Sequence, residues 1–347
     1  MPERHALPFR LRWQADWCRR LGSPLYADLM LRAADDAEAG GPVAAVVEGH
    51  ETDPLETMLQ LRLMGAVHRL ALSGRAPELA ACYPSTGGHG RLEETWEAFR
   101  STVETRMPEV REHVPRPVQT NEVGRSRVLA CGFLAVTHRH RMPLRLLEVG
   151  ASAGLNLRWD SFWYQAGELS LGDAMSPVRF RDFVVEGWPP PNAEVRISTR
   201  AGCDPNPVDL ADEDGVLTLR SYVWADQLER LELLDGAIAA AAAAGVEVER
   251  ADTVSWLDQR LAEPVPGECA VVFHSIVMQY VAEDERERIS AAIAAAGRRA
   301  TADAPLCRLA FEPGGEEAEL RLITWPGGEE RVLARAGYHG ADVRWLG

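Results

Sequence analysis

The segment 145–157, which reads RLLEVGASAGLNL, constrains the fold of this chain more than any other. Its apolar start predicts a buried strand over 145–149, and the run of Gly, Ala and Ser that follows predicts a tight turn. A helix is expected over about 154–161. Such small side chains leave the backbone N–H groups at the start of a helix open to a ligand. We therefore expect a binding site at the carboxyl end of a central strand.

The composition narrows the classes of partner and reaction. The 347 residues suit one large or two ordinary domains, and nearly half of them are apolar. The formal net charge of −15 argues against nucleic acid as a partner, because duplex binding needs a positive surface. The sequence contains no lysine, which excludes a Schiff-base lysine and a P-loop lysine.

The chain also lacks the patterns of a secreted, membrane-bound or metal-binding protein. It carries no basic-then-apolar leader and no apolar run long enough to cross a bilayer. A soluble cytoplasmic protein without a membrane partner is expected, and formation of a homo-oligomer is left open. Six cysteines occur singly, at 18, 82, 131, 203, 269 and 307. Because none forms a C-x-x-C pair, neither a disulfide framework nor a metal site is expected, and Cys269 is interpreted as a buried small hydrophobe.

The first third of the chain is predicted to be helical. Asp53, Pro54 and Glu56 have the spacing of a helix cap with a proline in the first turn. The expected helices cover 55–72, 91–113 and 123–139. We assign them to a helical N-terminal domain, 1–120, and to the start of a second domain, 121–347.

From Leu144 onward, short apolar runs alternate with helical patterns, which is typical of a parallel α/β sheet. The expected strands are 145–149, 193–198, 246–249, 269–274 and 306–311. The expected helices are about 154–161, 224–244, 253–262 and 283–299. An aromatic and proline-rich insertion after Trp159 is long enough for a hairpin over the site. Two strands joined by Pro326-Gly327-Gly328 and a last strand over 342–346 follow. The predicted fold class is α/β, with a mostly parallel, Rossmann-like sheet and antiparallel strands at its C-terminal end.

The turn after the first strand fits two enzyme classes. Gly150, Ser152 and Gly154 satisfy the Gly-x-Ser-x-Gly elbow of a serine hydrolase, in which Ser152 is the nucleophile. That class needs a later acid and a later histidine, for which His274 and His339 are available. The same turn is similar to the first motif of S-adenosylmethionine (SAM) methyltransferases, an acid followed by alternating glycines. Several strands precede a hydrolase elbow, whereas the region before 145 is predicted to be helical, so the methyltransferase interpretation is favoured.

The methyltransferase interpretation assigns cofactor binding to residues at predicted strand ends. Glu148 ends an apolar strand, where a buried carboxylate needs a partner such as the ammonium group of SAM. Asp204 is placed to bind ribose hydroxyls, and Asp252 is placed near the adenine amino group. The turn residues assigned with them are Gly150, Ala151, Ser152 and Gly154. Ser152 stands where the usual motif has its middle glycine.

Further polar and aromatic residues are candidates for substrate binding and proton transfer. His274 and Glu312 follow the fourth and fifth strands, and His274 can accept a proton near neutral pH, although a buried, hydrogen-bonded histidine is the commoner arrangement. Glu122 is the second candidate proton acceptor, in the segment QTNEVGR that is expected to roof the site. The candidate substrate-binding residues are Asn121, Arg125, Tyr222 and Trp224. Helix capping by Asn121 and packing of the two aromatic residues are the alternatives.

Five segments of the chain resemble a family catalogued as domain of unknown function 2332 and expected to be actinobacterial. They are PVQTNEVGRS (117–126), LLEVGASAGLNLRWD (146–160), RAGCDPNPVD (200–209), SYVWADQ with the arginine-rich helix after it (221–230) and VVFHSIVMQY (271–280). The resemblance implies a methyltransferase-like fold and no established substrate. The expected function is a SAM-dependent methyltransferase of a small molecule. The alternatives are a serine hydrolase that uses Ser152 and an adenosyl-ligand-binding protein without catalytic activity.

Overall fold

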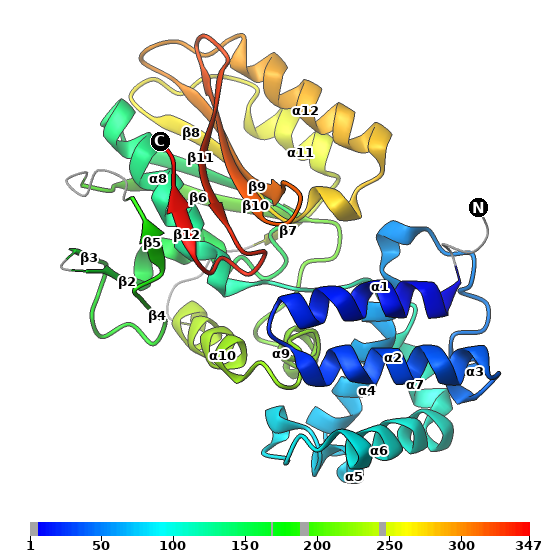
Figure 1. Ribbon diagram of the computed structural model, residues 1–347. Coiled ribbons are helices and arrows are strands. Elements are labelled where there is room, and N and C mark those ends of the chain that lie inside the picture. Colours follow the sequence, from blue (N-terminus) through cyan, green and yellow to red (C-terminus); the bar gives the residue numbers. More distant parts are fainter. Residues whose placement is uncertain (1–5, 168, 188–193, 243–247) are drawn as a thin grey trace. The chain divides into compact units, whose positions relative to one another are not determined.

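The computed structural model describes residues 6–167, 169–187, 194–242 and 248–347 (Figure 1). The chain divides into two compact units. The helical unit comprises Met1–Thr120 and Ala211–Glu232, and the sheet unit comprises Asn121–Leu210 and Leu233–Gly347. The sequence analysis placed 211–232 with the sheet, whereas the structure places this segment in the helical unit. None of the described helices is long and apolar enough to cross a lipid bilayer.

The helical unit is built from helices around a mainly aliphatic core that also contains packed aromatic rings. Its helices are α1 (Leu7–Arg20), α2 (Pro24–Glu38), α3 (Pro42–Val46), α4 (Leu59–Leu72), α5 (Pro77–Ala80), α6 (Leu92–Thr105), α7 (Met107–His113) and α9 (Glu213–Ser221), with 3₁₀ turns η2 (Leu55–Thr57) and η3 (Pro84–Thr86). In the core, Tyr26 stacks on Trp224 with ring centroids 6.3 Å apart and lies 6.2 Å from Tyr83. Trp224 comes from the segment after α9, so that segment completes the core of this unit.

The predicted start of the helix over 55–72 is wrong. The chain forms the 3₁₀ turn η2 there and continues as α4 only after Met58, whose φ of 50° interrupts the helix. Asp53 caps neither element. Its carboxylate instead pairs with Arg62 at 2.7 Å and with His50 at 3.0 Å. His50 and the buried Arg62 thus bind the carboxylate that the sequence pattern assigned to the helix backbone.

The other two predicted helices are also interrupted. The helix predicted over 91–113 is α6 followed by α7, with a break at Arg106. Pro108 follows the break, and its missing N–H removes a hydrogen bond that a continuous helix needs. The helix predicted over 123–139 is the 3₁₀ turn η4 (Val123–Arg125) followed by α8 (Ser126–His140).

The sheet unit has one large sheet, a small sheet and helices around them. The strands of the large sheet are β1 (Leu144–Val149), β5 (Val184–Glu186), β6 (Ile197–Asp204), β7 (Val248–Arg250), β8 (Cys269–Ser275), β9 (Leu306–Pro313), β10 (Ala318–Trp325), β11 (Glu329–Ala336) and β12 (Val343–Trp345). Besides α8, the helices are α10 (Leu228–Ala242), which begins in the helical unit, α11 (Thr253–Arg260) and α12 (Glu283–Gly297), with 3₁₀ turns η5 (Asn156–Ser161) and η6 (Met278–Tyr280). These elements are labelled in Figure 1.

The order of the large sheet is β5-β12-β11-β10-β9-β8-β1-β6-β7. The five strands from β9 to β7 in this order are parallel to one another. The strands β10, β11 and β12 are antiparallel to their predecessors, and the hairpin predicted at Pro326–Gly328 joins β10 to β11. The α/β class, the mostly parallel sheet and the antiparallel C-terminal strands are therefore confirmed.

Helices cover both faces of the parallel strands. On one face, α8 places Phe133 against Phe273 of β8 and against Trp159, with ring centroids 5.1 and 4.8 Å apart. On the other face, Leu147 and Val272 join a core with residues of α11 and α12. Side chains alternate between the faces along a strand, so the pairing register decides which helix layer each residue meets.

Three predicted elements differ in position or type. The strand predicted over 193–198 corresponds to β6, which starts later, at Ile197, and continues through Gly202 to Asp204. A β-carbon at Gly202 would lie 2.7 Å from Ala151 Cβ, so glycine allows β6 to pass the turn after β1. The helix predicted over 154–161 is the 3₁₀ turn η5. The helix predicted over 224–244 is α10, which starts at Leu228. Residue 193 of the predicted strand 193–198 lies outside the described residues. So do residues 243–247, which include the end of the predicted helix 224–244 and the start of the predicted strand 246–249.

The aromatic insertion after Trp159 forms a small sheet. Its strands are β2 (Trp163–Ala166), β3 (Leu169–Leu171) and β4 (Arg179–Arg181), in the order β3-β2-β4. The predicted hairpin is β2 and β3, which pair in antiparallel fashion. Tyr164 of β2 is buried against Phe180 and donates a hydrogen bond to the Trp159 carbonyl at 2.7 Å. Residues 188–192 of the insertion lie outside the described residues.

Gly132 sets the distance between α8 and the sheet, and its substitution tests this packing. A β-carbon there would lie 2.6 Å from Leu309 Cδ1 and 3.1 Å from Leu320 Cδ2. We expect Gly132→Val to lower the free energy of unfolding by about 1–3 kcal/mol through overpacking. Ala135→Val on the same helix is the control. It should lower the free energy of unfolding by no more than about 0.7 kcal/mol, the difference in helix propensity between alanine and valine. Chemical denaturation measures both variants, and equal losses would contradict this packing role.

Candidate functional site

The turn after β1 has an unusual backbone. Gly150, Ser152 and Gly154 have φ angles of 67°, 52° and 70°, in the left-handed region. A β-carbon at Gly150 would also lie 2.6 Å from the side chain of Val277. Glycine is thus required at 150 by the fold itself. Ser152 adopts a left-handed conformation that glycine occupies at lower energy.

The backbone N–H groups of this turn are already bonded within the protein. Two side chains accept most of these hydrogen bonds. Asn121 Oδ1 accepts from Ala153 N at 3.2 Å and from Leu155 N at 2.9 Å, and Asp204 Oδ2 accepts from Ser152 N at 2.9 Å. The two others, from the N–H groups of Ala151 and Gly154, go to the carbonyls of Cys203 and Ala151 at 3.0 and 2.7 Å. The expectation of N–H groups open to a ligand is therefore wrong.

Glu148 is the least satisfied polar residue of the site. Its side chain is 2 % exposed, and its Oε2 atom has no hydrogen-bond partner among the described residues. Burial raises the pKa of Glu148 well above the usual range of a glutamate, the charge of Asp204 raises it further, and the charge of Arg125 lowers it. The two acids lie at the carboxyl ends of neighbouring strands, because Glu148 pairs with Gly202 two residues before Asp204. They form an acidic pair in a poorly solvated place.

Asp204 retains capacity for a ligand although it also holds the protein together. Besides the Ser152 amide, its Oδ1 accepts a hydrogen bond from Asn206 N at 2.8 Å. A carboxylate has about four acceptor positions, so two protein donors leave room for further ones. Its exposed fraction is 7 %, which makes it part of the same buried layer as Glu148.

The segment Asn121–Arg125 lies against the turn, as the sequence predicted. Asn121 holds the turn through its side chain, and the Glu122 carbonyl accepts from Asn156 Nδ2 at 3.4 Å. The Glu122 carboxylate accepts from Gly124 N at 3.2 Å and is buried. Arg125 donates to the carbonyl of Ser275 at 2.8 Å and to that of Tyr338 at 3.2 Å. The segment therefore links the turn to the end of β8 and to the loop that follows β11.

His274 does not share the position of Glu148. In the register of β1 and β8, Glu148 pairs with Phe273, so the next residue, His274, points to the opposite face of the sheet. It is fully buried. Its Nε2 atom accepts from Arg308 at 3.1 Å, which puts the proton on Nδ1, 2.6 Å from Glu312.

This network on the α12 face has a structural role. Arg308 also donates to Ser290 of α12 at 3.2 Å, and Glu312 accepts from the amide of Val277 at 3.0 Å. Because both nitrogens of His274 are engaged, we do not retain it as the proton acceptor. The sequence analysis missed Arg308 as the partner. The sequence signal for this partner is Arg308 itself, a charged residue within the otherwise apolar run of β9, which indicates a buried acceptor.

Asp252 acts as a helix cap in the structure. It is exposed and accepts from the amide of Ser255 at 2.9 Å and from its hydroxyl at 2.7 Å, at the start of α11. These hydrogen bonds lower the pKa of Asp252. The preceding residue, Ala251, donates to the Asp204 carbonyl at 3.3 Å. The backbone next to Asp252 thus contacts Asp204, whereas the Asp252 carboxylate caps α11.

Tyr222 and Trp224, the candidate aromatic substrate residues, belong to the helical unit. A β-carbon at Gly65 of α4 would lie 2.8 Å from the ring of Tyr222, which shows how closely the ring packs on that helix. The Tyr222 hydroxyl donates to the carbonyl of Pro117 at 3.2 Å. Trp224 stacks on Tyr26. Both rings therefore contribute to the packing of the helical unit, as the alternative interpretation expected.

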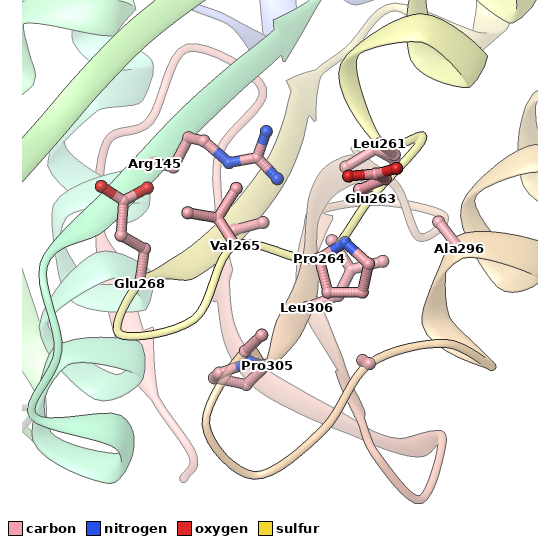
Figure 2. Close-up of a pocket in the computed structure, with 12 residues that line it drawn as sticks. Arg145, Leu261, Glu263, Pro264, Val265, Glu268, Ala296, Pro305 and Leu306 are labelled. Carbon is pink, nitrogen blue, oxygen red and sulfur yellow. The ribbon is translucent and has the colours of Figure 1, made fainter.

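A small hollow of the sheet unit lies at the amino ends of the strands (Figure 2). Arg145, Glu268 and Pro305 line it together with Val265 and Leu306. Its volume of about 20 Å³ is room for roughly one water molecule. It is therefore too small for a substrate.

The fold and the site define an α/β protein whose central strands end in a buried acidic pair beside a tightly bonded turn. The family model described as an uncharacterized protein conserved in bacteria, domain of unknown function 2332, matches residues 9–345. The chain belongs to this family. No curated protein and no solved structure matched the chain.

The strain at Ser152 can be measured with a matched pair of glycine variants. We expect Ser152→Gly to raise the free energy of unfolding by about 0.5–1 kcal/mol, because relief of the left-handed conformation exceeds the entropic cost of glycine. Ala153→Gly is the control, because its φ is not positive, and it should lower stability by at least about 0.5 kcal/mol. Urea titrations measure both. Destabilisation by Ser152→Gly comparable to that by Ala153→Gly would contradict the assignment of strain.

Proposed function

We propose that the sheet unit binds S-adenosylmethionine at the carboxyl ends of β1 and β6 and uses it to methylate a small molecule. The observation that carries the proposal is Glu148. Its Oε2 atom is buried and has no hydrogen-bond partner among the described residues, beside a second acid, Asp204. A buried carboxylate without a partner is costly, so a ligand with a positive charge is the chemistry that this position favours.

The position in the sheet supports the same ligand site. The chain continues from β1 to β6 and β7 on one side and then to β8 and β9 on the other side. In open α/β sheets, ligands bind outside the carboxyl ends of the strands where the strand order reverses in this way. Glu148 and Asp204 both lie at this point.

The turn supports a cationic ligand better than an anionic one. Its N–H groups are bonded to Asn121, Asp204 and main-chain carbonyls, so they do not form a free cradle for phosphate. The acidic pair would repel phosphate as well. An ammonium group suits the Glu148 Oε2 atom, which has no hydrogen-bond partner among the described residues, and ribose hydroxyls suit the remaining acceptor positions of Asp204.

The residues present suggest a division of roles. Glu148 would hold the ammonium group, and Asp204 would accept from ribose hydroxyls. When bound, the cofactor supplies an activated methyl group on a sulfonium. The contribution of the protein is then to align the acceptor, since near-attack geometry can supply several kcal/mol. Glu122, buried in the segment against the turn, is the remaining candidate to take the proton of the acceptor.

The serine hydrolase is the less favoured alternative. The positive φ of Ser152 is compatible with a nucleophile elbow. That mechanism, however, uses the N–H of the next residue in the oxyanion hole, and the N–H of Ala153 is bonded to Asn121. Labelling of Ser152 by a fluorophosphonate probe would support the hydrolase over the methyltransferase.

Removal of the charge of Glu148 tests the ligand site. Glu148→Gln should keep the fold, because the amide is close in shape to a protonated carboxyl, and should weaken SAM binding about 10–100-fold through loss of a charged partner. Glu316→Gln, an exposed site with the same change of charge, should leave the affinity within about twofold. Isothermal titration calorimetry measures both. No binding of SAM to the wild-type protein at millimolar concentration would refute the proposal.

The protonation of Glu148 predicts how binding depends on pH. Burial and Asp204 raise its pKa, so the ligand-free protein keeps this carboxyl protonated to higher pH than an ordinary glutamate. A cation favours the ionised form and therefore releases a proton on binding. The apparent affinity should rise with pH up to the pKa of Glu148 in the free protein. The binding enthalpy should vary with the ionisation enthalpy of the buffer, and this variation should be absent in Glu148→Gln.

A further inference from the structure

Three metal-ligating side chains converge at the other end of the strands, away from Glu148. Cys269 begins β8, Cys307 lies near the start of β9, and His140 ends α8. Figure 1 labels these three elements. The two sulfur atoms are 3.9 Å apart, and Cys307 Sγ lies 3.6 Å from His140 Nε2. All three ligand atoms lie within 4.8 Å of one another. Both thiols are fully buried, whereas His140 is half-buried.

These separations match those around a single tetrahedral zinc ion. Zinc lies about 2.3 Å from thiolate sulfur and about 2.0–2.1 Å from imidazole nitrogen, so tetrahedral angles place two sulfurs about 3.8 Å apart and sulfur and nitrogen about 3.5 Å apart. Two of the three observed separations agree with these values, at 3.9 Å between the sulfurs and 3.6 Å between Cys307 Sγ and His140 Nε2, and the third pair, Cys269 and His140, lies within 4.8 Å. One ion between the three atoms therefore needs only small shifts of the side chains.

A disulfide between the two cysteines fits the register less well. Cys307 pairs with Val271, which places Cys269 two residues away from the position opposite Cys307. Diagonal neighbours of this kind have Cα atoms about 7–8 Å apart. A disulfide needs Cα atoms about 4.4–6.8 Å apart. Both cysteines are free thiols in the structure.

We propose that Cys269, Cys307 and His140 bind one Zn²⁺ ion. Two thiolates and a neutral imidazole give an uncharged site with Zn²⁺, whereas Cu⁺ would leave a net negative charge in the core, which costs more. Thiolate and imidazole ligands are also those that zinc takes in proteins. Water or the Thr324 hydroxyl, 3.9 Å from Cys307 Sγ, is the fourth ligand. The ion would then join the end of α8 to β8 and β9.

A groove lies beside the three ligands. It lies between the end of α8 and strands β10 and β11 and has a volume of about 300 Å³. His138 and Arg139 line it on the helix side, and Leu322 and Thr324 line it on the sheet side. Thr324 also contacts Cys307, and the two residues pair in the register of β9 and β10. Thr324 thus separates the groove from the three ligands.

Metal binding by the full-length, untagged and reduced protein tests the site. After incubation with zinc and removal of the excess, elemental analysis should find about one ion per chain. Co²⁺ in place of zinc should give the intense visible absorption of a tetrahedral thiolate site. Cys307→Ser and His140→Gln should each weaken zinc affinity at least about 100-fold in competition with a chromogenic chelator. His140 is half-buried, so its variant keeps the test valid if the cysteine variant fails to fold.

Cys131→Ser is the control, because Cys131 is a buried cysteine of α8 outside the cluster. It should keep full zinc stoichiometry and the cobalt spectrum. Three outcomes would overturn the proposal: no zinc retained by the reduced wild type, zinc retained equally by His140→Gln, or loss of zinc in Cys131→Ser alone. A Cys269–Cys307 disulfide in a protein that binds no zinc when reduced would overturn it as well.

Discussion

The sheet unit depends on the hydrogen bonds that two side chains make to the turn after β1. Asn121 bridges two amides of the turn, and Asp204 binds a third, so a segment before α8, a central strand and its neighbour are tied at one point. These bonds hold Ser152 in a backbone conformation that a serine rarely adopts. Without these bonds, three N–H groups of the buried turn would have no acceptor, and each unpaired buried N–H group would lower the stability of the fold.

This arrangement gives the two acids at the strand ends different tasks. Asp204 is bonded to amides on both oxygens and is therefore fixed in place. Glu148 has a buried oxygen with no partner among the described residues, and burial opposes its ionisation. The Asp204 carboxylate thus helps to hold the fold, whereas the Oε2 atom of Glu148 can still accept a hydrogen bond. Under the proposed function, recognition at this site would rest on side-chain carboxylates, because the backbone amides are bonded within the fold.

The sequence allowed prediction of most strands and of the contact between the segment Asn121–Arg125 and the turn, but not of most other contacts between elements. Apolar runs located β1, β8 and β9, and Pro326–Gly328 located the hairpin, because these signals are local. Gly202 in the middle of β6 was not predicted, since its reason is the proximity of Ala151. Glu148 and His274 were both placed correctly at strand ends, yet the register that turns them to opposite faces depends on pairing between strands. The contact between Cys269 and Cys307 spans 38 residues and leaves no motif in the sequence.

The assignment of Ala211–Glu232 to the helical unit has a consequence for how this family can evolve. The chain leaves the helical unit at residue 120, returns to it and leaves it again, so neither unit is a continuous stretch of the gene. Recombination at residue 120 would separate Tyr26 from Trp224, the ring on which it stacks. The two units therefore cannot be exchanged between genes as independent modules. A family model that runs from residue 9 to 345 is consistent with inheritance as a single piece.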